Sequence, residues 1–258
     1  MTIYRYLISL ATVAALALGL AAALPAARAE AGEPLVVVEL YTSQGCSSCP
    51  AADAFLGELL AMRSDILGLE FHVDYWDNLG WKDSFSSAES TARQRAYAKA
   101  LGLTYVYTPQ MVIQGSVNEV GSDKMAVMAA IENARHGSAP YLDISLRQDG
   151  NGGLNLSLPA SAGAGEPGAP ATVWLINFDR QFVTDVTAGE NIGRKMRNNH
   201  VVRAQKAIGT WTGAALEISL GADQLGGGEA SDACAILVQS DNFGPIIGAA
   251  SLWLGSEN

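Results

Sequence analysis

The sequence predicts an α/β domain followed by an all-β domain. Two observations support this prediction. From residue 35 to about residue 135, short β-branched runs alternate with segments of helical periodicity, as in a sheet covered by helices. After residue 138, the pattern changes to short runs of alternating apolar and polar residues. Each run is bounded by Gly, Asn or Asp, as in a β-sandwich.

The first part of the chain predicts strands and helices in succession. Residues 35–41 form a β-branched run that predicts a buried strand, and Pro50 opens a helix. A second helix, at residues 86–101, has Ser87 and Ser90 as possible caps and stops at Gly102. The remaining expected elements are strands at residues 67–75 and 111–114, a short strand ending at Gly121, and a helix from the cap Ser122-Asp123 to about Arg135.

The second part predicts antiparallel strands. Leucines alternate with polar residues at 154–158, and Asp149-Gly150-Asn151-Gly152 before them is a hairpin turn. Further strands are expected at residues 172–178, 214–220, 234–239 and 246–254. We therefore expect an α/β domain at residues 30–138 and a β-rich domain at residues 139–258.

Composition limits the class of protein. The chain has 258 residues, of which 49% are hydrophobic and 16% charged, so it can bury a sizeable core. Its 16 basic and 26 acidic residues give a net charge of -10 without a basic run, which argues against nucleic acid as a partner. Three cysteines are too few for a disulfide-stabilised mini-protein.

The N-terminal residues resemble an export signal. Arg5 precedes an apolar run at residues 7–24, and Ala27-Arg28-Ala29 fits a signal peptidase site. We expect residues 1–29 to be a signal peptide that is cleaved after Ala29. The alternative is an uncleaved membrane anchor, because the apolar run approaches the length of a membrane span. In both cases the folded part lies in the periplasm or is secreted, and after cleavage no membrane contact is expected.

One short motif carries redox chemistry. Cys46-Ser47-Ser48-Cys49 stands between a strand and the start of a helix, where backbone N–H groups favour a thiolate. This position makes Cys46 the nucleophile and Cys49 the resolving thiol. The alternatives are an inert disulfide and half of a zinc site, but no second pair of cysteines completes a zinc site. Cys234 stands in an apolar run and is expected to be an inert, buried thiol.

Three segments carry a family resemblance: VVVELYTSQGCSSCPAAD, FHVDYWDNLGWKDSF and YTPQMVIQG. They resemble a family of secreted bacterial proteins with a thioredoxin-like domain and no established reaction. The resemblance extends to GENIGR at residues 189–194 and GPIIGAAS at residues 244–251. YTSQGCSSC is more distantly similar to the start of glutaredoxins. The resemblance and the order of elements imply a thioredoxin-like fold for the first domain.

Three further residues gain a role from this resemblance. Thr108-Pro109 precedes a strand at the position where thioredoxin-like folds place a cis proline facing the dithiol. There, the Thr108 backbone would bind an extended substrate. Glu39 falls near the position of a buried acid that exchanges a proton with the resolving cysteine. Alternatively, Glu39 faces solvent or bonds a backbone amide.

Other polar and aromatic residues leave alternatives open. His72 and Asp74 share a strand face and are either a hydrogen-bonded pair, part of a copper site with the cysteines, or ordinary core residues. Trp76 and Trp81 either line the dithiol groove and contact substrate or fill the core. Residues 189–200 form either a loop facing the dithiol or a hairpin turn before a solvated strand.

These features predict an envelope thiol–disulfide oxidoreductase. Cys46, Cys49 and Glu39 would be catalytic, and Thr108, Pro109 and Trp76 would bind substrate. No cofactor and no resident metal are expected, and the partners are protein or small-molecule thiols and disulfides of the envelope. The alternatives are a non-catalytic binding protein with an idle disulfide, and a copper metallochaperone.

Overall fold

The computed structural model describes residues 34–137, 141–161, 170–225 and 231–254. The expected signal peptide at residues 1–29 lies outside them. The described residues form one compact unit. In the described part of the chain, no helix has both the length and the apolar character needed to cross a membrane.

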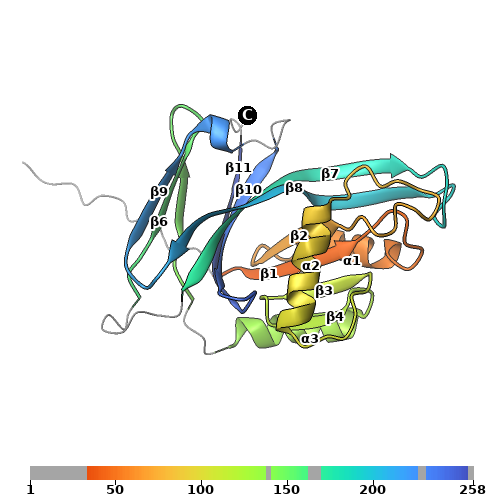
Figure 1. Ribbon diagram of the computed structural model, residues 1–258, viewed down its shortest axis with the longest axis horizontal. Helices are drawn as coiled ribbons and strands as arrows, with labels where there is room; N and C mark the ends of the chain where they lie inside the picture. The colour runs from red at the N-terminus through yellow and green to blue at the C-terminus, as the bar shows by residue number, and fades with distance from the viewer. Residues whose placement is uncertain (1–33, 138–140, 162–169, 226–230, 255–258) are drawn as a thin grey trace, which may run out of the picture. The chain divides into compact units, whose positions relative to one another are not determined.

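Strands hold more of the described residues than helices do (Figure 1). The three α-helices that the structure describes are α1 (Pro50–Met62), α2 (Ala88–Ala100) and α3 (Lys124–Arg135). The strands are β1 (Val36–Thr42), β2 (Ile66–His72), β3 (Gln110–Ile113), β4 (Val117–Val120), β5 (Ser145–Gln148), β6 (Leu154–Leu158), β7 (Ala171–Asp185), β8 (Lys195–Trp211), β9 (Leu216–Leu220), β10 (Ala233–Ser240) and β11 (Ile246–Trp253).

The expectation of a thioredoxin-like α/β domain followed by a β domain is wrong. Eight strands form one mixed sheet in the order β11-β10-β7-β8-β2-β1-β3-β4, and β5-β6-β9 form a second, three-stranded sheet (Figure 1). The large sheet thus contains strands from both sides of residue 138. Its two halves meet where β2 pairs in parallel with β8, at Glu70 and Val201.

The strand β8 explains why this sheet is not evident in the sequence. Its N-terminal half contains Arg197, Asn198 and Asn199, which are typical of a loop or a solvated strand and not of a strand inside a large sheet. In the structure, Asn198 and Asn199 are buried. The neighbouring strand β2 is buried along its whole length, as expected for a strand that has another strand of the sheet on each side.

The helices cover opposite faces of the large sheet. Val36, Val38 and Leu40 of β1 pack with α1 and α3 in one core. The alternate residues Val37 and Tyr41 pack in a second core with β2, α2 and the strands β7, β8 and β10. This alternation, expected for a strand with both faces buried, places α1 on one side of β1 and α2 on the other. A third core lies between the small sheet and the strands β7, β10 and β11.

A buried ion pair joins the second core to α2. Arg93 donates from Nε to Glu39 Oε2 (2.9 Å) and from Nη2 to Glu39 Oε1 (2.8 Å), and both side chains are buried. The hydroxyl groups of Tyr41 and Tyr97 donate to the same carboxylate over 2.7 and 2.9 Å. Gln239 of β10 donates to the Tyr97 hydroxyl over 2.8 Å, so the cluster connects β1, α2 and β10.

We expect Arg93→Met to lower the free energy of unfolding by about 3–5 kcal/mol, because it leaves the Glu39 carboxylate buried without its cation. Urea denaturation measures this loss. The double variant Glu39→Gln with Arg93→Met removes both charges and should recover part of the stability. A double variant that is as unstable as the sum of the two single variants would contradict this assignment.

Candidate active site

The two cysteines of the C-x-x-C motif form a disulfide at the start of α1. Cys49 is the N-cap residue of the helix and Pro50 follows it at the first helical position. The Cα atoms of Cys46 and Cys49 are 5.4 Å apart in the disulfide, and both residues are 0% exposed. The disulfide therefore lies at the positive end of a helix dipole, beneath a layer of other residues.

Thr108 contacts the sulfur atom of Cys46. The Thr108 hydroxyl donates to Cys46 Sγ over 3.2 Å and itself accepts a hydrogen bond from Trp76 Nε1 over 2.9 Å. The Ser48 hydroxyl lies 3.3 Å from the same sulfur. The expected cis peptide bond between Thr108 and Pro109 is confirmed, and so is its place beside Cys46. Hydrogen bonds donated to a sulfur stabilise it as a thiolate once the disulfide is reduced.

The connection between β7 and β8, residues 186–194, covers the loop that carries the cysteines. We call these residues the ribbon tip and residues 43–49 the dithiol loop. Asn191 is fully buried and donates from Nδ2 to the carbonyl oxygens of Gln44 (2.9 Å) and Cys46 (2.8 Å). Glu190 accepts a hydrogen bond from the Ser47 amide over 3.1 Å. The residues at 189–194 thus form a hairpin tip that also faces the disulfide.

Hydrogen bonds of Gln44 hold the dithiol loop against neighbouring residues. Its backbone amide donates to Asp83 Oδ2 over 2.8 Å, and its side-chain oxygen accepts from Trp81 Nε1 over 3.1 Å. Its side-chain amide donates to Asn198 of β8 over 3.1 Å. Both tryptophans considered from the sequence therefore hold polar atoms of the site, Trp76 through Thr108 and Trp81 through Gln44.

A buried group of charged residues lies next to this loop. His72 Nδ1 is 2.7 Å from Asp83 Oδ2, and His72 Nε2 is 3.6 Å from Glu70 Oε1. Asp74, which the sequence offered as a partner for His72, instead accepts a hydrogen bond from the Thr91 hydroxyl over 2.6 Å. Within the described ranges, no group of three or more His, Cys, Asp or Glu residues has a metal-binding arrangement.

Burial and charge have opposite effects on His72. Burial favours its neutral form, but the charge and hydrogen bond of Asp83, together with Glu70, outweigh burial and raise the pKa of His72 to about 10. Burial would raise the pKa of Asp83, but the charge of His72 prevails and holds that pKa below its usual value. The pair is therefore an imidazolium and a carboxylate at neutral pH.

Asp53, like Glu70 and Asp83, is an acidic residue of the site that the sequence did not single out. It lies in the first turn of α1, is 2% exposed, and accepts a hydrogen bond from the Thr42 hydroxyl over 2.7 Å. Burial, followed by the charge of Glu70, raises the pKa of Asp53 well above its usual value. Its second oxygen, Oδ2, has no hydrogen-bond partner among the residues described. An acid in the apolar segment PAADAF, four residues after Cys49, is the signal that could have identified it.

Glu39 and Cys234 are both buried, as their surroundings in the sequence suggested. The Glu39 carboxylate is occupied by Arg93, Tyr41 and Tyr97, and these contacts favour a structural role over proton transfer. Burial raises the pKa of the Cys234 thiol to about 12, which keeps it protonated and unreactive.

Comparisons with known proteins agree on a family without an assigned function. A family described as "Protein of unknown function (DUF1223)" matches residues 37–239. The crystal structure of protein AGR_C_4864 from Agrobacterium tumefaciens has 33% sequence identity and a TM-score of 0.72, with 88% of this chain and 97% of that chain covered.

A second solved structure is similar in fold alone. HBP35 of Porphyromonas gingivalis has 16% sequence identity and a TM-score of 0.59, with 88% of this chain and 79% of that chain covered. No curated protein matches the sequence.

The ion pair of His72 should make stability depend on pH. The raised pKa of His72 contributes stability below about pH 6.5, and this contribution is lost as the pH rises towards 10. We expect His72→Gln to lower the free energy of unfolding by about 3–5 kcal/mol near pH 6 and by less near pH 10. Urea denaturation across this range tests the prediction, with His136→Gln as the control because that histidine side chain is 75% exposed. Parallel pH curves for wild type and His72→Gln would contradict it.

The hydrogen bonds of Asn191 should limit access to the disulfide. We expect Asn191→Ala to raise the rate of disulfide reduction by a water-soluble phosphine about tenfold, because the loss of about 1–1.5 kcal/mol favours local opening. Alkylation of the released thiols measures the rate. Ile192→Ala is the matched control, because Ile192 lies on the same tip and is 66% exposed. Equal rates in the two variants would show that the tip does not control access.

Proposed function

The chain belongs to the DUF1223 family of proteins of unknown function, and we propose that it is a thiol–disulfide oxidoreductase acting through Cys46 and Cys49. One observation carries the proposal: the hydrogen-bond chain from Trp76 through Thr108 ends on Cys46 Sγ, at the start of a helix. Such donors stabilise a thiolate at one sulfur of the pair, which an inert disulfide does not require.

The proposed reaction exchanges one disulfide for another. In the reduced protein, the Cys46 thiolate attacks a substrate disulfide, forms a mixed disulfide and releases one substrate thiolate. Cys49 then loses its proton and attacks Cys46 Sγ, which restores the Cys46–Cys49 bond and releases the second substrate thiolate. The substrate gains two electrons and two protons, and an external thiol or dithiol reduces the protein again. The reverse sequence oxidises a substrate dithiol.

Thr108 and Pro109 are the proposed substrate-binding residues. The Thr108 backbone lies at the dithiol loop, where the Ser48 hydroxyl donates to the Thr108 carbonyl oxygen over 3.4 Å. Ser48 is exposed, so a substrate chain that displaces it reaches both the Thr108 backbone and Cys46 Sγ. Trp76 donates a hydrogen bond to the Thr108 hydroxyl and therefore lies beside the proposed path of the substrate chain.

The N-terminal residues support a place in the cell envelope, where the partners would be protein or small-molecule thiols and disulfides. Arg5, the apolar run and Ala27-Arg28-Ala29 carry this part of the proposal. In an oxidising compartment a dithiol pair can form a disulfide and exchange it with other thiols.

A second candidate function is a non-catalytic binding protein with a structural disulfide. The complete burial of both cysteines favours it, because a buried disulfide is protected from exchange. The two functions differ in one property: an oxidoreductase must expose Cys46 to substrate, which requires the residues above the disulfide to move.

Cys49→Ser should trap the intermediate of the first step. We expect this variant to form a stable mixed disulfide with bis(2-hydroxyethyl) disulfide through Cys46, whereas the reduced wild-type protein turns this compound over with a dithiol as reductant. Intact-mass measurement after alkylation identifies the adduct.

The controls are Cys46→Ser and Cys234→Ser. Cys46→Ser should be inactive, and Cys234→Ser should retain turnover because the Cys234 thiol is buried and keeps its proton. No turnover by the wild type, together with no adduct on Cys49→Ser, would favour the binding protein.

A further inference from the structure

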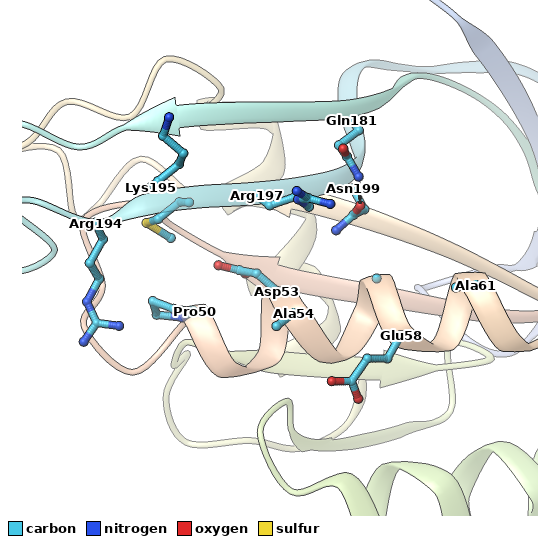
Figure 2. A pocket seen from close by; sticks show the side chains of 12 residues that line it. Pro50, Asp53, Ala54, Glu58, Ala61, Gln181, Arg194, Lys195, Arg197 and Asn199 are labelled. Carbon is cyan, nitrogen blue, oxygen red and sulfur yellow. Dashed lines mark hydrogen bonds between the residues drawn. The ribbon is translucent and has the colours of Figure 1, made fainter.

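A pocket of about 750 Å³ opens beside the dithiol loop, between α1 and the paired strands β7 and β8 (Figure 2). It begins at Pro50, the residue after Cys49, and extends along α1 as far as Ala61. Its volume lies within the usual range of small-molecule sites.

Positive charge gathers at the strand side of this pocket. Arg194, Lys195 and Arg197 line it, and Figure 2 shows Arg194 at the same end as Pro50. Lys195 pairs with Asp185 over 3.5 Å. In the described part of the chain, no carboxylate forms an ion pair with Arg194 or Arg197. Both arginines are exposed, and their charges at the rim of the pocket favour an anionic ligand.

Buried polar groups complete the pocket. Asn199 is 8% exposed, and its Oδ1 accepts a hydrogen bond from Gln181 over 2.8 Å, which leaves its Nδ2 as a donor. This Nδ2 lies against Gly57 of α1, where a Cβ atom would come within 2.8 Å of it. The glycine therefore allows a buried amide donor to reach the pocket wall.

Asp53 contributes a second donor. It lines the same pocket, is 2% exposed, and its Oδ2 has no hydrogen-bond partner among the described residues. Burial, followed by the charge of Glu70, raises the pKa of Asp53 well above its usual value, which favours the protonated form that can donate to an anion. The other acid of the pocket, Glu58, is paired with Lys124.

We infer that this pocket binds the carboxylate end of a small organic acid, and, resting on the proposed function, that this acid is the thiol or disulfide substrate. A guanidinium group matches the two oxygens of a carboxylate, and Arg194 and Arg197 each offer one to the pocket. Pro50, Ala54, Ala61 and Met196 provide apolar wall for an aliphatic body. Because the pocket begins next to Cys49, a substrate a few bonds long brings its sulfur to the dithiol loop while its charge stays in the pocket.

The test compares three model disulfides that differ in charge: 3,3′-dithiodipropionate (dianion), bis(2-hydroxyethyl) disulfide (neutral) and cystamine (dication). For the wild type we expect kcat/KM to be highest for the dianion. In Arg194→Ala and Arg197→Ala, the ratio of kcat/KM for dianion over neutral compound should fall about tenfold each, the effect of one charged hydrogen bond. Arg197→Glu should shift the preference towards cystamine.

Arg147→Ala is the matched control, because Arg147 is an exposed arginine on β5 and its loss changes the net charge equally. Its charge preference should equal that of the wild type. Turnover of the neutral disulfide without any preference for the dianion would overturn the pocket assignment and leave the proposed function intact.

Binding of succinate separates the two proposals, because succinate contains no sulfur. We expect succinate to shift the backbone amide resonances of α1 and β8 in the wild type, with about tenfold weaker binding in Arg197→Ala. Succinate binding without turnover of any disulfide would overturn the proposed function and the identity of the acid as its substrate. Absence of succinate binding together with absence of charge preference would overturn the site itself.

Discussion

The site depends on one buried carboxylate, that of Glu70 in β2. Glu70 accepts hydrogen bonds from the Asn198 side chain (2.6 Å) and the Asn199 amide (2.5 Å), and these bonds hold β8 against β2 where the two halves of the large sheet meet. A buried carboxylate is costly unless its oxygens are satisfied, so β8 cannot shift along β2 without exposing this charge to an apolar environment. The position of β8 in turn fixes the ribbon tip over the disulfide and Arg197 over α1.

The same charge contributes to the protonation of its neighbours. Asp83, with a smaller effect of Glu70, raises the pKa of His72, and burial, followed by Glu70, raises the pKa of Asp53. Hence an imidazolium and its Asp83 carboxylate partner lie beside the disulfide, and the protonated form of Asp53 is favoured over its charged form. The dithiol loop is bound to these buried residues by the hydrogen bond from the Gln44 backbone amide to Asp83. The same group of buried ionisable residues therefore contacts the dithiol loop and includes Asp53, which lines the pocket.

Local features of the site were predictable, and its long-range contacts were not. The C-x-x-C motif at a helix start follows from a short segment, because cap chemistry depends on nearby residues, and the cis bond before Pro109 follows from the family resemblance. The partner of Glu39 lies 54 residues away, and Asn198 lies 128 residues from Glu70. No periodicity indicates such pairs. The change of rhythm near residue 138 predicts a boundary, and the pairing of β8 with β2 across it is a long-range contact of this kind.

The central claim is that the buried Cys46–Cys49 disulfide takes part in exchange, and its reduction potential tests this most directly. The protein is equilibrated in buffers of dithiothreitol or glutathione and alkylated, and the reduced fraction is measured by mass. We predict a potential between about -270 and -120 mV, the range of dithiols that exchange with substrates. A potential below about -300 mV, as in structural disulfides of secreted proteins, would contradict a redox function.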